Sequence, residues 1–342
     1  MNYTFSLHRT IGYGFVCLDL VRTETEGIII CEGYVRLSVI AGGRFLLPKF
    51  VWEVFVLKIL RSVQEIQDYV REVKKQGRSI GLVPTMGALH EGHLTLMRTA
   101  RQACDVVIAS VFVNPVQFGP NEDYEAYPRR FAEDCRTLET VPVDAVFHPE
   151  PAEMYPEGYS TYVAVESDIT NKLCGARRPG HFRGVATVLV KLMNLSQAEQ
   201  AFFGQKDAQQ VVVIRRFVED LNLPVKIQMV PIVREESGLA RSSRNVYLSA
   251  EERQAALVLS RSLQKASAAF AGGEQDAARL KELVRGELAV EPMADVDYVE
   301  LYSFPALSEI ACVKEPALLA IAVRIGKTRL IDNVILGAEA CC

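Results

Sequence analysis

The sequence predicts an α/β protein: a doubly wound, Rossmann-like parallel sheet followed by a smaller C-terminal α+β domain. From residue 57 onward, short apolar runs alternate with segments whose apolar residues recur at helical spacing. One of these runs, residues 106–113, is apolar apart from a single serine, as expected for a strand covered on both faces. After residue 245 the order changes to two helical segments followed by strand-like runs, which indicates a second domain.

Residues 1–56 lie before this alternation and have a different sequence pattern. They contain β-like runs at 27–31, 34–40 and 50–57, and they lack the charged, apolar and small-residue regions of a secretory signal. We interpret them as an extension outside the main fold. Two explanations stay open: a misassigned start, with true initiation near residue 56 or 57, or a genuine added β-element.

The main fold is expected to begin with a strand at 57–60 and a helix. Ser62 precedes this helix and Glu65 follows three residues later, which is the pattern of a capping box. Gly77 marks the end of the helix. Strands that alternate with helices in this way lie parallel in one sheet, and ligands bind at the carboxyl ends of such strands.

The second strand, at residues 80–83, leads into the stretch around which the site is organised. Pro84 and Gly87 break this strand, and residues 94–103 then form an amphipathic helix. A strand, a tight turn and a helix N-terminus together make a site for an anion, because the first helical N–H groups are unpaired.

His90 and His93 stand at the start of that helix, three residues apart, and therefore face the same way on a helical turn. Three interpretations of the pair are open. They are packing or surface histidines, they are metal ligands without a third ligand nearby in sequence, or their imidazoles donate hydrogen bonds to nucleotide phosphates. We favour the third, because a strand delivers both residues to the start of a phosphate-binding helix.

Polar side chains also follow two other strands. Asn114 and Gln117 come directly after the run at 106–113, where their amides can donate and accept hydrogen bonds; a simple polar turn is the alternative. Lys206 follows an apolar strand and a glycine, at the start of a helix beginning near Asp207. The helix dipole disfavours a lysine there unless an anion lies between them, and the alternative is a solvated surface lysine.

Shorter segments complete the first domain. Strands are predicted at 143–147 and 225–230, and another helix ends at Leu195. His181 and Arg183 stand at the start of that helix, where they either hold an anion or cap the helix and order the loop before it.

Residues 234–245 form a polar loop with glycine, serines and arginines, a composition suited to a mobile phosphate clamp. Beyond the loop, Ser249 and Glu252 repeat the capping-box pattern before an Ala- and Leu-rich helix. A second helix is followed by strand-like runs at 296–302, 317–323 and 328–335. We therefore divide the main fold into a nucleotide- and substrate-binding domain at 57–232 and an α+β lid domain at 233–342.

Composition argues against several classes of protein. The chain has 342 residues and a formal net charge of −4, without the basic stripe expected of a nucleic-acid-binding protein. No apolar run approaches the roughly 20 residues that cross a bilayer, so no membrane association is expected. The eight cysteines are scattered without a Cys-x-x-Cys pair, which favours reduced thiols in a cytoplasmic protein.

A longer motif surrounds the two histidines. The pattern His-x-Gly-His resembles the signature of nucleotidyltransferases and class I aminoacyl-tRNA synthetases, and one family is resembled more closely: pantothenate synthetase, or pantoate–β-alanine ligase. That family is identified by the string Val83-Pro84-Thr85-Met86-Gly87-Ala88-Leu89-His90-Glu91-Gly92-His93. Its other motifs recur in the same order, in the segments at 112–118, 127–129, 180–187, 201–210 and 239–245, and the resemblance places 127–129 on a helix. The resemblance covers residues 57–336.

The resemblance implies roles for particular residues of this chain. Those expected to bind ATP are Met86, Gly87, Ala88, Leu89, His90, Glu91, Gly92, His93, Gly204, Gln205, Lys206, Asp207, Val233, Arg241, Ser242, Ser243 and Arg244. Those expected to bind pantoate or β-alanine are Gln117, Gln210, Asn114 and Tyr127, with aromatic packing as the alternative for Tyr127. The catalytic group is His93, His90, Lys206 and Arg244, and Arg241 departs from the family by standing where leucine is usual.

The activity that the resemblance implies is ATP-dependent condensation of (R)-pantoate with β-alanine, giving pantothenate, AMP and diphosphate through a pantoyl adenylate. It also implies a homodimer. Mg²⁺ is expected to bind together with the ATP, and we name no protein ligand for this ion. Two rivals remain open: another nucleotidyltransferase that leaves AMP on its product, and a non-catalytic nucleotide-binding module. The module would account for the glycine turns and Lys206 but not for Gln117, Gln210 and a clamp on a second domain.

Overall fold

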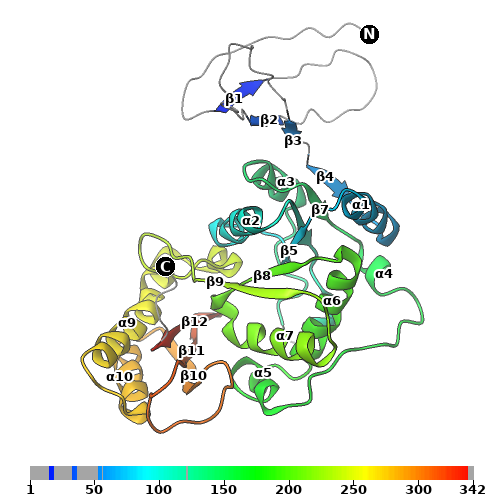
Figure 1. Ribbon diagram of the computed structural model, residues 1–342. Helices are drawn as coiled ribbons and strands as arrows, with labels where there is room; N and C mark the ends of the chain where they lie inside the picture. The colour runs from blue at the N-terminus through cyan, green and yellow to red at the C-terminus, as the bar shows by residue number, and fades with distance from the viewer. Residues whose placement is uncertain (1–14, 19–32, 37–52, 56, 121, 338–342) are drawn as a thin grey trace, which may run out of the picture.

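The computed structural model describes residues 15–18, 33–36, 53–55, 57–120 and 122–337, and the structural statements below concern these residues. Figure 1 shows a large sheet with helices on both of its faces and, beside it, a smaller part in which helices accompany a separate sheet. The predicted α/β class with a C-terminal α+β portion is therefore confirmed.

The large sheet has six parallel strands in the order β4-β7-β6-β5-β8-β9. These strands are β4 (Lys58–Leu60), β5 (Ile80–Thr85), β6 (Val106–Val111), β7 (Ala145–Phe147), β8 (Gln200–Gly204) and β9 (Lys226–Val230). The chain adds strands on one side of β5 up to β7 and then crosses to the other side with β8. Ligands of doubly wound proteins bind at the carboxyl ends of the strands where the order reverses, which is here between β5 and β8.

Helices cover both faces of this sheet (Figure 1). The helices of this part of the chain are α1 (Val63–Lys75), α2 (Glu91–Ala103), α3 (Phe131–Glu139), α4 (Pro151–Met154), α5 (Leu173–Arg177), α6 (His181–Ser196) and α7 (Ala208–Asp220). Helices α1, α6 and α7 bury one apolar core against the sheet and α2 and α3 bury another. The predicted capping box before α1 is present, with the Glu65 N–H donating to Ser62 Oγ at 3.1 Å.

Three local predictions for this domain were wrong. Strand β5 continues through Pro84 to Thr85. Proline has no N–H to donate, but the strand tolerates it because the Pro84 nitrogen faces β8, and β5 pairs with β8 only at Gly81 and Leu82. Tyr127 lies in a turn instead of on a helix, because the following proline disfavours helical backbone at Tyr127. Helix α2 begins at Glu91, earlier than expected, with His90 as its N-cap.

The C-terminal part has three helices and an antiparallel sheet in the order β10-β11-β12. Its elements are α8 (Ala250–Ala255), α9 (Leu257–Ala271), α10 (Ala277–Ala289), β10 (Ala294–Ser303), β11 (Ala317–Ile325) and β12 (Thr328–Leu336). It has an apolar core of its own, in which the helices pack on the sheet. The capping box of Ser249 and Glu252 is present, but the helix that it starts ends at Ala255 and a second one begins at Leu257.

Near the N-terminus, β1 (Phe15–Leu18), β2 (Gly33–Arg36) and β3 (Glu53–Phe55) form a three-stranded antiparallel sheet. Strands β2 and β3 overlap two of the predicted β-like runs, and β1 was not predicted. The run at 27–31 lies outside the described residues.

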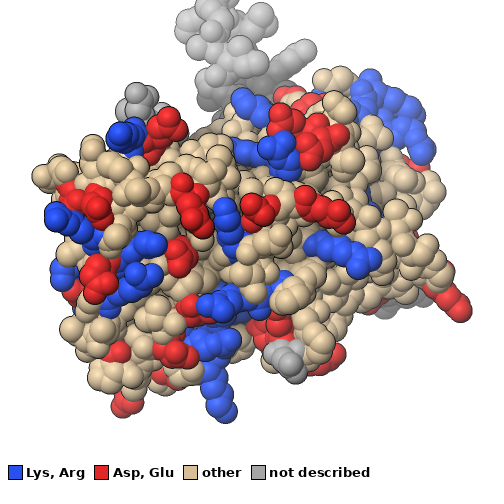
Figure 2. Space-filling model, turned by 90° about the horizontal axis from the view of Figure 1, so that it is seen from below, with Lys and Arg blue, Asp and Glu red and all other residues tan. Residues whose placement is uncertain are grey.

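No helix in the described part of the chain has the length and apolarity to cross a membrane. Figure 2 shows acidic and basic side chains mixed over one face of the molecule. Cys104, Cys174 and Cys312 carry thiols outside any disulfide, whereas Cys17, Cys31, Cys341 and Cys342 have no described side chains.

Candidate active site

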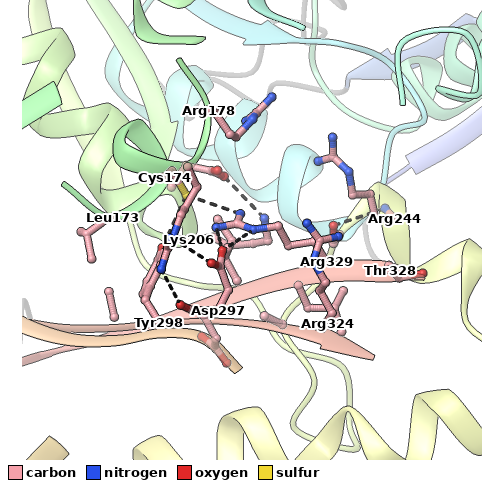
Figure 3. A pocket seen from close by; sticks show the side chains of 18 of the residues that line it. Leu173, Cys174, Arg178, Lys206, Arg244, Asp297, Tyr298, Arg324, Thr328 and Arg329 are labelled. Atoms are coloured by element: carbon pink, nitrogen blue, oxygen red, sulfur yellow. Dashed lines mark hydrogen bonds and ion pairs between the residues drawn. The ribbon is translucent and has the colours of Figure 1, made fainter. Parts of the chain in front are cut away.

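Two adjoining cavities lie at the carboxyl ends of β5 and β8. We call the smaller one, of about 230 Å³, the inner chamber; its walls include His90, His93 and Gln117. The larger one, of about 1180 Å³, is the interdomain cleft, which the C-terminal sheet walls on one side. Figure 3 shows basic side chains from both domains around this cleft. The residues that line both cavities are Arg178, His181, Lys206, Asp207, Gln210, Ser242 and Arg244.

His90 and His93 stack face to face at the start of α2. Their ring centroids are 4.0 Å apart with an interplanar angle of 24°. The Gly92 N–H donates to His90 Nδ1 at 3.2 Å, and the His90 N–H donates to His93 Nδ1 at 3.3 Å. Each Nδ1 is therefore an acceptor, so in the neutral rings the proton sits on Nε2 and leaves one N–H donor per ring for a ligand.

The surroundings of both rings favour the neutral form. Desolvation, helped by nearby Lys206 and Arg241, lowers the pKa of His90 from 6.5 to about 4. Desolvation, together with His90 and Lys206, also lowers the pKa of His93 well below 6.5. Lys206 and Arg241 also line this chamber and bring positive charge to it, and an anion bound there would offset that charge.

Acid should destabilise the protein through His90. In the unfolded chain the ring binds a proton near pH 6.5, but in the folded chain only near pH 4, so the free energy of unfolding falls as the pH drops between these values. For one such group the loss reaches at most about 2 kcal/mol at pH 5. We expect His90→Asn, which keeps a capping side chain, to lose less stability than wild type between pH 7.5 and 5 in urea titrations. Equal losses in both proteins would contradict the buried, neutral state of His90.

Asp134 of α3 stabilises the turn between β5 and α2 from outside the chamber. The backbone N–H groups of Ala88 and Leu89 donate to its carboxylate at 3.1 and 2.8 Å. Gly87 has a φ of +81°, and a Cβ there would lie 2.8 Å from Asp134 Oδ2, so only glycine fits. None of the three turn residues lines the chamber, but they fix the position of His90.

Gln117 is oriented by buried Asn114, which lies just before the short helix η1 (Pro115–Gln117). Asn114 Nδ2 donates to Gln117 Oε1 at 3.0 Å and to the Gly184 carbonyl at 3.2 Å, while its own Oδ1 accepts from Tyr155 at 2.7 Å. Gly184 permits this packing, because a Cβ would lie 2.5 Å from the Gln117 Cα. Both amide residues line the inner chamber.

Lys206 lies in the turn η3 (Gln205–Asp207) between β8 and α7 and lines both cavities. Its Nζ is 3.6 Å from Asp207 Oδ2. Gln210, one turn further on, also lines both cavities. Gln205 lines neither cavity and instead contacts the C-terminal sheet.

Residues of the predicted clamp loop line both cavities. Arg244 donates from Nε and Nη2 to Asp123 at 2.9 Å each, and this pairing, against the effect of burial, raises its pKa. Tyr127 is buried and its hydroxyl lies 3.0 Å from Ser243 Oγ. Arg241 lines the inner chamber, and its buried Nε has no hydrogen-bond partner in the described structure. A buried donor without a partner is unusual, and a bound anion would give Arg241 the partner that it lacks.

Sequence reasoning missed a second layer of charged residues. Arg178 donates to both oxygens of Glu122 at 2.8 and 2.5 Å, and its third nitrogen lies 3.0 Å from His181 Nε2. His181 Nδ1 in turn lies 2.9 Å from the Gln117 carbonyl, so this series of contacts supports the segment that carries Gln117. The side chain of Arg183 lies over the Tyr162 ring and lines neither cavity.

Most of the predicted site residues meet around the inner chamber. Its walls include Met86, His90, Gly92, His93, Asn114, Gln117, Tyr127, Gly204, Lys206, Asp207, Gln210, Val233, Arg241, Ser242, Ser243 and Arg244. Gly87, Ala88, Leu89, Glu91 and Gln205 do not line it, and Glu91 pairs with Arg98. Within the described residues no three His, Cys, Asp or Glu side chains are arranged to hold a metal ion.

The fold and the chamber define a class: nucleotide-dependent α/β enzymes that hold phosphates at helix starts where a doubly wound sheet reverses. Comparison with known proteins then gives the family. The family model for pantoate–β-alanine ligase matches residues 58–335, and the chain belongs to that family. It therefore catalyses the ATP-dependent ligation of pantoate and β-alanine.

Individual relatives agree over nearly their whole length. The chain is 58% identical over 279 residues to the pantothenate synthetase of Pelotomaculum thermopropionicum, a match covering 82% of this chain and 99% of the relative. The crystal structure of the Thermus thermophilus pantothenate synthetase has a TM-score of 0.78 at 43% identity, covering 81% and 99%. The Francisella tularensis ligase, described as complexed with "Beta-gamma ATP" and β-alanine, has a TM-score of 0.68 at 32% identity, covering 83% and 99%.

Proposed function

We propose that the inner chamber and the adjoining part of the interdomain cleft form one adenylation site. There the pantoate carboxylate attacks the α-phosphorus of ATP, diphosphate leaves, and the β-alanine amine then attacks the carbonyl carbon of the pantoyl adenylate. AMP leaves with the carboxylate oxygen, and pantothenate is released. The observation that carries this proposal is the convergence of His90, His93 and Lys206 on one chamber at the point where the strand order reverses.

The phosphates are assigned to groups that carry N–H donors. His90 and His93 each have an Nε2–H available, and Lys206 adds a positive charge between the two cavities. Ser242, Ser243, Arg244 and Arg241 contribute from the clamp loop, together with the glycine turns at 86–93 and 204–207. These groups stabilise charge as it builds on the departing diphosphate, so the reaction needs no covalent nucleophile from the protein.

Pantoate is assigned to Gln117 and Gln210, whose amides can bind both its hydroxyl groups and its carboxylate. The polar atoms of Asn114 are occupied by protein groups, so we assign it to the orientation of Gln117. Tyr127 lies beside Ser243 in the wall of the chamber. There its ring helps to exclude water from the adenylate.

We further propose that Mg²⁺ accompanies ATP and is held mainly by the phosphates. Asp207 is the acidic residue that lines the inner chamber in the described structure, so the protein can offer one carboxylate there. This fits the preference of Mg²⁺ for substrate phosphates with few protein ligands, and the ion would neutralise phosphate charge.

An end-point assay tests this function and separates it from its rivals. ATP and D-pantoate are incubated with and without β-alanine, and diphosphate, AMP and pantothenate are measured. AMP and pantothenate should appear together only when all three substrates are present. A product that retains AMP would identify a different nucleotidyltransferase, and the absence of turnover would favour a binding module.

We propose the division into 1–56, 57–232 and 233–342, with the clamp loop 234–245 at the hinge, and we propose a cytoplasmic homodimer. A shortened chain beginning at Leu57 should have kcat and KM values within about twofold of those of the full chain, because the matching family model covers only residues 58–335. Loss of activity in a folded, shortened protein would show that residues 1–56 belong to the functional enzyme. Analytical ultracentrifugation of the full and the shortened chain measures whether each forms the proposed dimer.

A further inference from the structure

Asn333 of β12 is a buried residue of the C-terminal sheet that contacts the turn carrying Lys206. Its Nδ2 donates to the Gln205 carbonyl at 3.1 Å and to the Lys206 carbonyl at 3.0 Å. Its Oδ1 accepts from Gln205 Nε2 at 3.2 Å. One side chain thus makes three hydrogen bonds to two consecutive residues, which precede it by about 127 positions in the chain.

The chemistry of the contact fixes which way the amide faces. Both backbone carbonyls can only accept a hydrogen bond, so the nitrogen of Asn333 must face them and the oxygen must face Gln205. Both amide hydrogens are used and the oxygen has a partner. Aspartate has nearly the same shape but would present an acceptor to two acceptors.

A neighbouring contact ties the same strand to the clamp loop. Asp332 is buried and accepts from Arg234 at 2.7 and 3.0 Å, and it also accepts from the Asn333 N–H at 2.8 Å. Arg234 pairs through its backbone with Ala240 across the loop. Asp332 and Asn333 therefore bridge β12 to the clamp loop and to the turn that carries Lys206.

From these contacts we infer that Asn333 is a positioning residue, which holds the Lys206 turn so that the lysine faces the phosphates. This inference rests on the proposed function of Lys206. The hydrogen bonds fix the two peptide planes next to the Lys206 Cα, and through them the direction in which the side chain leaves the turn. The C-terminal domain thereby acts on the adenylation step without contacting the substrate at this position.

A purely structural role for Asn333 would have different consequences. The loss of domain packing would lower thermal stability and slow both half-reactions together. The loss of Lys206 positioning would slow diphosphate release and leave the attack of β-alanine on preformed adenylate unchanged, because the diphosphate has already left. The KM for pantoate should also be unchanged, since the assigned pantoate residues do not contact Asn333.

The experiment compares Asn333→Ala, Lys206→Ala and the double variant with wild type, following diphosphate release and, in single turnovers, the β-alanine step. We expect Asn333→Ala to lower the kcat of adenylation roughly tenfold, the scale of a small misplacement of a catalytic group. In the Lys206→Ala background the same change should cost less than twofold, because residues that act as a unit are not additive. Asn333→Ser replaces the alanine variant if the latter does not fold.

A matched control is Lys172→Met, which removes another interdomain hydrogen bond, from Lys172 Nζ to the Leu307 carbonyl at 2.8 Å. It should leave both half-reactions within twofold of wild type. An equal loss from Asn333→Ala with and without Lys206, or equal slowing of both half-reactions, overturns the inference. Wild-type adenylation by Lys206→Ala would instead overturn the proposed function, so the two failures are distinguishable.

Discussion

Lys206→Ala should release diphosphate at least about 100-fold more slowly than wild type in the presence of ATP and pantoate. That factor is the usual cost of removing one donor that stabilises charge in a transition state. Lys206 lines both cavities, and its positive charge acts on His90 and on His93. Its effect should therefore fall on the kcat of adenylation more than on the KM for pantoate.

Rapid-quench measurement of diphosphate from ATP and pantoate checks this expectation. Lys226→Ala is a suitable control, because Lys226 is exposed on β9 and lines neither cavity. The control should retain the wild-type rate. If Lys206→Ala also retained it, the lysine would be a solvated surface residue and its assignment to the phosphates would fail.

Local signals in the sequence predicted much of the fold. Ser62 with Glu65, and Ser249 with Glu252, act over four residues each, and both capping boxes are present. The stacking of His90 on His93 follows from their separation by three residues at a helix start. By contrast, the continuation of β5 through Pro84 depends on where the ladder to β8 stops, and no local pattern records that.

The parts of the site that sequence reasoning missed are held by contacts between distant segments. Asp123 pairs with Arg244, 121 residues away, and Glu122 pairs with Arg178, 56 residues away. Each of these acids looks like an ordinary surface carboxylate in the sequence. Asn333 belongs to the same group, because its partners lie in another domain. The consecutive arginines before α6 were the one local signal that could have drawn attention to Arg178.

His93→Ala should also slow diphosphate release by about 100-fold or more. Variants of His93 also test whether its role in capping the helix can be separated from its role in binding phosphate. The ring of His93 has two functions in the structure: its Nδ1 caps the helix by accepting from the His90 N–H, and its Nε2–H is left for a phosphate. Alanine removes both functions. The loss of this capping-box contact lowers stability, and the loss of the donor lowers the rate.

His93→Gln separates the two functions, because glutamine at the third helical position can also reach back to the N-cap N–H. We expect this variant to have wild-type thermal stability but to release diphosphate far more slowly, since an amide that caps the helix no longer presents an imidazole N–H to the phosphates. Urea titrations and rapid-quench assays on both variants supply the comparison. Wild-type diphosphate release by His93→Ala would remove His93 from the catalytic group and leave it as a helix cap, with Lys206 and the clamp loop carrying the charge of the departing diphosphate.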